Sequence, residues 1–124
     1  DEVPQNIVLI KNTPYSWLLK QVNLVIHHFG FGTTAEVLKA GLPSIPIPHI
    51  FDQKNRAKQI YKLGFATKPL NINNIDGHKL AQAIISTKAD CKIYSDCFEL
   101  SSKIAKENGV EYAVELIGEF IKKI

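Results

Sequence analysis

An apolar run that ends at a pair of histidines and leads into two glycines constrains the fold of this chain more than any other stretch. The run, residues 24–26, is short and rich in β-branched side chains, which is typical of a strand buried on both faces of a parallel sheet. Gly30 and Gly32 follow it and permit backbone geometry and close approach that a Cβ would prevent. A helical pattern then continues to Ala40. A strand, a glycine turn and a helix are therefore predicted in that order.

The start of that helix is a candidate phosphate-binding site. Thr33 or Thr34 is predicted to cap it, and unpaired backbone N–H groups meet the positive end of the helix dipole there. His28 could donate a ring N–H to a phosphate oxygen, or it could only bond to backbone carbonyls. Glu36 could bind ribose hydroxyls, or it could only stabilise the helix dipole. On the glycines alone, a tight turn without a ligand is an equally good interpretation.

The remainder of the chain predicts one α/β domain. Short apolar runs alternate with helical patterns, which indicates an open, mostly parallel, Rossmann-like sheet with helices on both faces. The 124 residues allow a single domain, 1–124, or part of one. No apolar run approaches the roughly 20 residues that a membrane-spanning helix needs. The chain is therefore expected to form a globular α/β unit without a transmembrane segment.

The boundaries of the predicted elements follow from turn and cap residues. The expected strands are residues 6–10, 23–27, 44–48 and 65–68. The expected helices are residues 15–22, the stretch through 36–40, 55–63, a helix capped by Asp76, 94–107 and 110 to the end. Gly41 and Gly64 should end their helices, Gly41 in the left-handed conformation. Trp17 is predicted to anchor the core.

Charge and cysteine patterns limit the possible partners. The net charge is +3, but the lysines are spread over many segments and alternate with acids, unlike the clustered basic stripe of a nucleic-acid-binding protein. Cys91 and Cys97 match no common zinc spacing, and neither do the four histidines. We therefore expect free thiols, no bound metal and no nucleic-acid partner.

Polar clusters follow three of the predicted strands, in loops at residues 11–14, 27–34 and 49–53. Ligands of open α/β sheets bind beyond the carboxyl ends of the strands, so these loops are predicted to form one site. Asp52 and Gln53 offer acceptors and donors side by side, as vicinal sugar hydroxyls require. Asp52 could instead only cap the next helix. The repeated placement favours a ligand site over an empty turn.

These residues resemble the donor-binding signature of nucleotide-sugar glycosyltransferases of the GT-B fold. The sequence HHFGFGTTAEVLKAGLP, followed by IPHIFDQ and LGF, is most similar to sterol glucosyltransferases and antibiotic glycosyltransferases. The similarity extends over residues 6–70, and it implies which part of the donor each site residue binds. The implied contacts are the diphosphate for His28, Gly30, Gly32, Thr33 and Thr34, the ribose for Glu36, the sugar hydroxyls for Asp52 and Gln53, and the uracil ring for the loop from Asn12 to Pro14.

Two aromatic residues depart from the pattern of this family. Bacterial members have two consecutive glycines after the second histidine, whereas Phe29 replaces the first of them here. Plant members carry tryptophan at the position of Phe31, so an aromatic side chain is compatible with the family there. The ring of Phe29 would either crowd the diphosphate or pack beneath it.

The resemblance also implies a function for the parent protein. It should transfer a hexose, with glucose as the first expectation, from a UDP-sugar to a hydroxyl acceptor such as a sterol or another lipid. No cofactor and no protein-bound metal are expected. The catalytic base of the family lies in an amino-terminal acceptor domain, so this chain should contain no catalytic residue and should be inactive alone. The parent is expected in the cytoplasm, with peripheral contact to a membrane.

Two alternatives remain beside this interpretation. The chain could be a non-catalytic module that binds nucleotide sugars or serves as a partner subunit. A dinucleotide dehydrogenase is disfavoured, because the G-x-G-x-x-G spacing and the acidic residue that follows it are absent.

Overall fold

A small parallel sheet forms the centre of the structure. In the computed structural model, which describes residues 3–124, strand β1 (Val25–His27) pairs in parallel with β2 (Ser44–Pro46), and Ile26 lies opposite Ile45. Ala66 adds one parallel bridge to the first residue of β2. The carboxyl ends of these segments therefore share one edge. The predicted parallel α/β arrangement is confirmed, with a smaller sheet than the sequence suggests.

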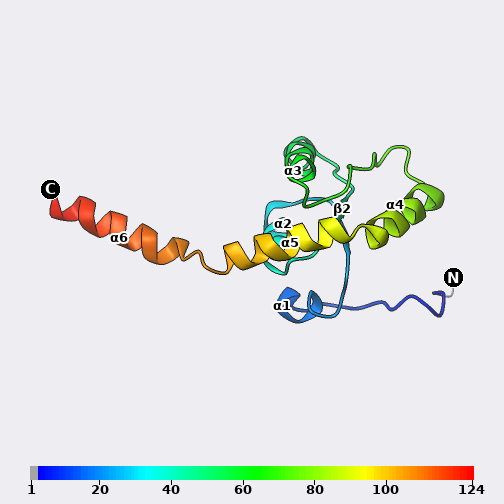
Figure 1. The fold of residues 1–124 in the computed structure, drawn as a ribbon, viewed down its shortest axis with the longest axis horizontal. Helices are drawn as coiled ribbons and strands as arrows, with labels where there is room; N and C mark the ends of the chain where they lie inside the picture. The colour runs from blue at the N-terminus through cyan, green and yellow to red at the C-terminus, as the bar shows by residue number, and fades with distance from the viewer. Residues whose placement is uncertain (1–2) are drawn as a thin grey trace.

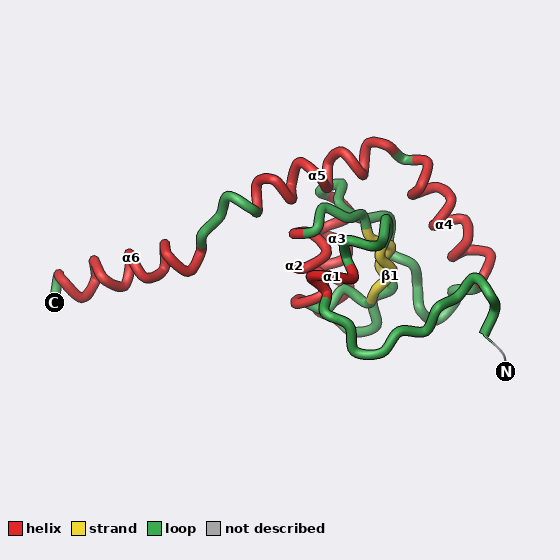
Figure 2. The backbone as a smooth tube through the Cα atoms, turned by 90° about the horizontal axis from the view of Figure 1, so that it is seen from below, coloured by secondary structure: helices red, strands yellow, loops and turns green. Residues whose placement is uncertain are grey.

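Six helices surround and extend this sheet within the described residues (Figure 1). They are α1 (Tyr15–Leu18), α2 (Phe31–Lys39), α3 (Phe51–Lys62), α4 (Gly77–Ala89), α5 (Cys91–Ile104) and α6 (Gly109–Lys122). Helix α5 packs against α2, and the Ser101 hydroxyl donates a hydrogen bond to the Lys39 carbonyl at 2.7 Å. Both views show α6 extending away from the other elements (Figures 1 and 2).

Several helix ends agree with the predicted caps. Asp76 accepts a hydrogen bond from the Lys79 N–H at 2.8 Å at the start of α4. Gly41 and Gly64 have φ values of +72° and +88°, the left-handed conformation that a helix-ending glycine adopts. Asn108 caps α6, so the predicted break between the last two helices is confirmed.

Three helices begin earlier than predicted. Helix α2 begins at Phe31 after Gly30, so neither Thr33 nor Thr34 caps it. Helix α3 begins at Phe51, which places Asp52 in its first turn instead of at its cap. Helix α5 begins at Cys91, because the Asp90 carboxylate accepts hydrogen bonds from the first N–H groups. Side-chain contacts with the backbone, which the apolar spacing does not reveal, set the starts of α3 and α5, whereas α2 begins without a side-chain cap.

The amino-terminal segment differs most from the prediction. Residues 6–10 form no strand, and Val8 is 80% exposed. Trp17 is 58% exposed and does not anchor the core, and Ile26 is 40% exposed, so β1 is not buried on both faces. A strand needs a neighbour to pair its N–H and C=O groups, and residues 3–124 provide none for this segment. The expected strand at 65–68 is likewise reduced to the bridge at Ala66.

The core lies between the sheet and helices α2, α3 and α5. Phe29 is the largest fully buried side chain, and it packs with Ala57, Ala66 and the partly buried Ile60. Cys97 is also buried, which raises the pKa of its thiol to about 11, and both cysteines are free thiols as expected. Within the described residues, every helix is too short or too polar to cross a membrane.

Candidate functional site

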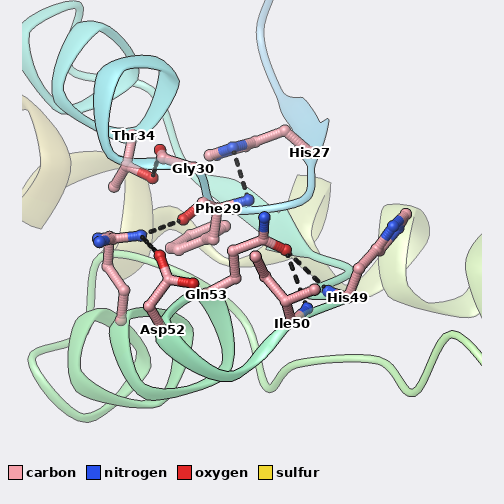
Figure 3. A network of polar contacts seen from close by, with 9 residues as sticks. His27, Phe29, Gly30, Thr34, His49, Ile50, Asp52 and Gln53 are labelled. Atoms are coloured by element: carbon pink, nitrogen blue, oxygen red, sulfur yellow. Dashed lines mark hydrogen bonds and ion pairs between the residues drawn. The ribbon is translucent and has the colours of Figure 1, made fainter.

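The loops at residues 27–34 and 49–53 follow β1 and β2 at the carboxyl edge of the sheet, whereas the predicted loop at residues 11–14 follows no strand. The Tyr15 hydroxyl, directly after the first loop, lies 3.3 Å from the Thr33 hydroxyl in α2. Arg56 of α3 donates a hydrogen bond to the Phe29 carbonyl at 2.7 Å (Figure 3). The loops at residues 11–14, 27–34 and 49–53 are therefore connected by side chains that cross between them.

Phe29 holds the central loop in an unusual conformation. Its φ is +68°, which costs a residue other than glycine roughly 1–2 kcal/mol. Its N–H donates to the His27 ring at 3.2 Å, its carbonyl accepts from Arg56, and its buried ring stacks on His27 at 4.3 Å between ring centroids. These contacts offset the conformational cost. Of the two alternatives for Phe29, the structure shows packing beneath the loop.

His27 is a neutral structural residue. Its Nδ1 accepts the Phe29 N–H, so the ring proton resides on Nε2, which donates to the Ser44 hydroxyl at 3.2 Å. Burial, together with the nearby charge of His28, lowers the pKa of His27 to about 4. This histidine supports the loop instead of binding a ligand.

The lowered pKa of His27 predicts acid sensitivity. The unfolded chain takes up a proton near pH 6.5, whereas the folded ring resists it until about pH 4. The free energy of unfolding should therefore fall as the pH drops from 6.5 to 4, by up to about 1 kcal/mol per pH unit for this partly exposed ring. Urea denaturation at several pH values measures this slope.

A matched pair of variants assigns that slope to one ring. His27→Gln removes the titrating group and should flatten the slope, whereas His49→Gln alters an exposed histidine and should leave it unchanged. An equal slope in the wild type and in His27→Gln would show that other groups cause the acid sensitivity.

The first backbone N–H groups of α2 have no partner within the helix. The N–H groups of Phe31, Gly32 and Thr33 precede the first hydrogen bond of the helix, which runs from the Thr34 N–H to the Gly30 carbonyl at 3.0 Å. Residue 30 is glycine, so no side chain at the cap position bonds to these N–H groups. They lie at the positive end of the helix dipole, so this position favours an anion.

The His28 ring lies directly against Gly30. A Cβ at Gly30 would stand 2.6 Å from the Nε2 atom of His28, so only glycine leaves room for the ring in this position. The exposed ring is thereby placed beside the free N–H groups of α2. His49, from the loop after β2, lies 6.3 Å from it between ring centroids.

The start of α3 supplies oxygen and amide groups at the next position along the edge. The Gln53 side-chain oxygen accepts hydrogen bonds from the N–H groups of His49 and Ile50, at 2.9 and 3.3 Å (Figure 3). These two bonds do not use the Gln53 side-chain nitrogen, so its N–H donors are left for another partner. Asp52 is exposed, and one of its carboxylate oxygens lies 3.5 Å from Arg56. Two side chains with complementary hydrogen-bonding groups therefore lie beside the α2 start.

The remaining predicted site residues lie in different surroundings. Thr34 is buried, and its hydroxyl donates to the Gly30 carbonyl at 2.7 Å, so the side chain supports the loop instead of facing the crevice. Glu36 forms an ion pair with Lys39 at 3.2 Å. Asn12 lines a hollow formed by residues 10–15 and Leu18.

Arg56 is a site-supporting residue that the sequence analysis misses. Its guanidinium bonds the Phe29 carbonyl and lies 5.6 Å from the centre of the Phe31 ring. Its spacing of four from Asp52 on one helix is the only sequence signal for its position. Among residues 3–124, no group of three or more metal-ligating side chains is placed to hold a metal ion.

The chain matches one protein family and is similar to glycosyltransferases from plants and bacteria. The family model described as erythromycin biosynthesis protein CIII-like, C-terminal domain, matches residues 1–117. A sterol 3-beta-glucosyltransferase of Arabidopsis thaliana is 35% identical over 114 residues, covering 92% of this chain and 18% of the relative. An O-mycaminosyltylonolide 6-deoxyallosyltransferase of Streptomyces fradiae is 30% identical over 118 residues, covering 95% of this chain and 28% of the relative.

A solved structure shows the same fold. The Streptomyces glycosyltransferase SsfS6, complexed with thymidine diphosphate, superposes with a TM-score of 0.77 at 21% identity, over 94% of this chain and 30% of that protein. The chain thus spans less than a third of each of these three proteins. The GT-B resemblance deduced from the sequence is confirmed at the level of fold and family.

Proposed function

We propose that this chain, which belongs to the family of erythromycin biosynthesis protein CIII-like C-terminal domains, binds the nucleotide-sugar donor of its parent enzyme. The parent would transfer a hexose, glucose first, from a UDP-sugar to a hydroxyl acceptor such as a sterol or another lipid. Relatives that act as sterol glucosyltransferases support this choice of donor and acceptor.

One observation carries the proposal. The His28 ring is held against Gly30, beside the three free N–H groups at the start of α2. Backbone N–H groups, a helix dipole and an imidazole converge on one point, and this combination suits a diphosphate. Asp52 and Gln53 follow along the same edge, where the hexose hydroxyls would bind.

The chemical role proposed for this chain in the parent enzyme is to stabilise the leaving group. As the bond between the sugar and the diphosphate breaks, negative charge grows on the diphosphate oxygens. Preorganised N–H groups of residues 31–33 and the His28 ring would stabilise that charge more strongly in the transition state than in the bound donor. The base that deprotonates the acceptor would come from another part of the parent, without a cofactor or a metal.

The nucleotide base and the ribose of the sugar donor would bind to residues near this site. The hollow beside Asn12 would hold the nucleotide base, and Glu36 the ribose, once its carboxylate leaves Lys39. A structural neighbour is complexed with thymidine diphosphate, which supports a pyrimidine nucleoside diphosphate as the ligand. We assign uridine because the sterol relatives are glucosyltransferases, and we place the parent in the cytoplasm.

The non-catalytic module is the competing function. Its main support in the sequence is Phe29, which could have crowded the diphosphate. Since the ring is buried beneath the loop, this objection no longer applies. The two functions share the same donor site, and an assay of the full-length parent with a UDP-hexose and a sterol distinguishes them by turnover.

Titration with uridine diphosphate tests the donor site in this chain. Amide resonances of residues 30–34 and the His28 ring resonances should shift in NMR spectra, with a dissociation constant of about 0.1–1 mM for half of a binding cleft. Uridine lacks the phosphates and should leave the α2 resonances unchanged. An intact loop whose amides do not respond to uridine diphosphate would refute the assignment.

A further inference from the structure

One segment of the chain is strongly basic. Between Asp52 and Asp76 there are five basic residues and no acidic residue, although the whole chain has a net charge of only +3. The basic residues are Lys54, Arg56, Lys58, Lys62 and Lys68. Elsewhere lysines and acids are mixed, so this segment is an exception to the dispersed pattern expected from the sequence. It comprises most of α3 and the strand-like stretch that follows.

This basic segment encloses a hollow that lies apart from the proposed donor contacts. The hollow has a volume of about 500 Å³ and separates the flank of α3 from the stretch at residues 68–73. In Figure 1 this region lies on one side of the sheet, and α1 with the amino-terminal segment lies on the other. The lining residues are Pro48, Lys54, Lys58, Tyr61, Lys68, Pro69, Leu70, Asn71 and Asn73.

Three lysines surround an apolar floor in this hollow. Lys54 and Lys58 are one helical turn apart on α3, and Lys68 comes from the opposite wall. All three are exposed, whereas Pro48 is buried and Leu70 is partly buried. The aliphatic stems of lysine can cover apolar surface while the ammonium groups stay in water. The hollow therefore offers an apolar interior with positive charge at its mouth.

Within the described residues 3–124, these three ammonium groups have no acidic partner. The ion pairs among residues 3–124 are Glu36–Lys39, Asp52–Arg56, Lys92–Asp96 and Glu99–Lys103, and none includes a lysine of the hollow. Like charges gathered around one opening repel each other, and an anionic ligand relieves that repulsion. The three lysines therefore favour a negatively charged ligand, and the apolar interior favours a ligand that also has an apolar part.

We propose that this hollow binds the head group of an anionic phospholipid and attaches the domain to a membrane surface. The lysines would contact the phosphate. Tyr61, which lines the hollow, and Ile72, which lies between the lining residues 71 and 73, are exposed and would enter the interfacial layer. Nucleic acid fits less well, because Tyr61 is the one aromatic side chain in the lining and stacking platforms use several. The proposal does not depend on the donor site.

Vesicle flotation of the full 124-residue chain tests the proposal. The chain should float with phosphatidylcholine vesicles containing about 30% phosphatidylglycerol and should not float with pure phosphatidylcholine. Raising the salt from about 0.05 M to 0.5 M should release it, because screening weakens the attraction. Lys54→Gln/Lys58→Gln/Lys68→Gln should lower the partition coefficient at least about tenfold.

A matched variant controls for net charge. Lys20→Gln/Lys88→Gln/Lys106→Gln removes three exposed lysines elsewhere and should change the partition coefficient less than about threefold. Circular dichroism verifies that both triple variants keep their helices. Tyr61→Ala, which changes no charge, should weaken flotation two- to fivefold if the ring enters the interface.

Four results would overturn the proposal. The chain could fail to float at all, or both triple variants could bind equally. Flotation with neutral vesicles would instead indicate the exposed apolar face of α6. Tighter binding of a single-stranded oligonucleotide or of inorganic phosphate than of the anionic vesicles, lost in the first triple variant, would assign the hollow to a soluble anion or to nucleic acid.

Discussion

Replacing Phe29 with alanine is expected to lower the free energy of unfolding by about 3–4 kcal/mol. The ring is 0% exposed and is the largest fully buried side chain of the structure. Its removal would leave a cavity between α3 and the sheet, beside Ala57 and Ala66. In a chain with so few buried residues, this loss is a large part of the total stability. Urea denaturation followed by circular dichroism measures it.

The neighbouring Phe31 provides the control. Its ring is 76% exposed, so Phe31→Ala should cost less than about 1 kcal/mol, chiefly through the lost contact with Arg56. If Phe29→Ala is too unstable to study, Phe29→Leu should show a loss of about 1–2 kcal/mol. Equal losses at both positions would show that Phe29 does not lie beneath the loop.

The backbone conformation allows a second comparison at the same position. Glycine adopts a φ of +68° without strain, whereas alanine does not. Phe29→Gly should therefore be more stable than Phe29→Ala, by about 1 kcal/mol, although glycine normally destabilises folded chains relative to alanine. The opposite order would indicate that residue 29 has a negative φ in solution.

Local signals in the sequence predict much of this structure. Asp76, Gly41 and Gly64 mark helix ends correctly, because a cap depends on one side chain and the nearest backbone groups. The two strands that form and the six helices come in the predicted order, since apolar periodicity reports which segments cross the core. The parallel sheet follows from that order and from the rules for crossover connections.

Features that depend on distant contacts are not predicted. The run at residues 6–10 has the composition of a strand, but composition does not supply a neighbour with which to pair. Trp17 is exposed for the same reason, because nothing in residues 3–124 covers it. The predicted ends of several helices err by two to four residues, where capping side chains, not apolar spacing, decide.

The candidate site likewise has some features that the sequence predicts and others that depend on distant contacts. The loops at residues 27–34 and 49–53 could be placed together from the sequence, since the carboxyl ends of parallel strands share one edge. The loop at residues 11–14 could not be placed by this rule, because no strand precedes it. The role of Arg56 could not, because its target is the Phe29 carbonyl, which points toward α3 only in the left-handed conformation. The sequence predicts that Thr34 contacts the ligand, yet its hydroxyl donates to the Gly30 carbonyl, a contact that is common for threonine inside a helix.

Replacing Gly30 with alanine is expected to weaken the binding of uridine diphosphate about 10- to 100-fold while changing stability little. The new Cβ would lie 2.6 Å from the Nε2 atom of His28, so the ring must leave its position beside the N–H groups of α2. A hydrogen bond from that ring to a charged phosphate is worth about 1.5–3 kcal/mol. The exposed ring can rotate into solvent, so the free energy of unfolding should change by less than about 1 kcal/mol.

Two further variants isolate the cause of that loss. Gly32→Ala adds a methyl group that meets no other protein atom within 4 Å, so it should leave the His28 ring in place and stabilise α2 by up to about 1 kcal/mol. In a His28→Ala background, where the clash is absent, Gly30→Ala should have almost no additional effect on affinity. Calorimetric titration of the four proteins gives the coupling energy between residues 28 and 30. If Gly30→Ala reduces affinity equally with and without the His28 ring, the glycine serves the close approach of the phosphate itself, and His28 is not a donor-binding residue.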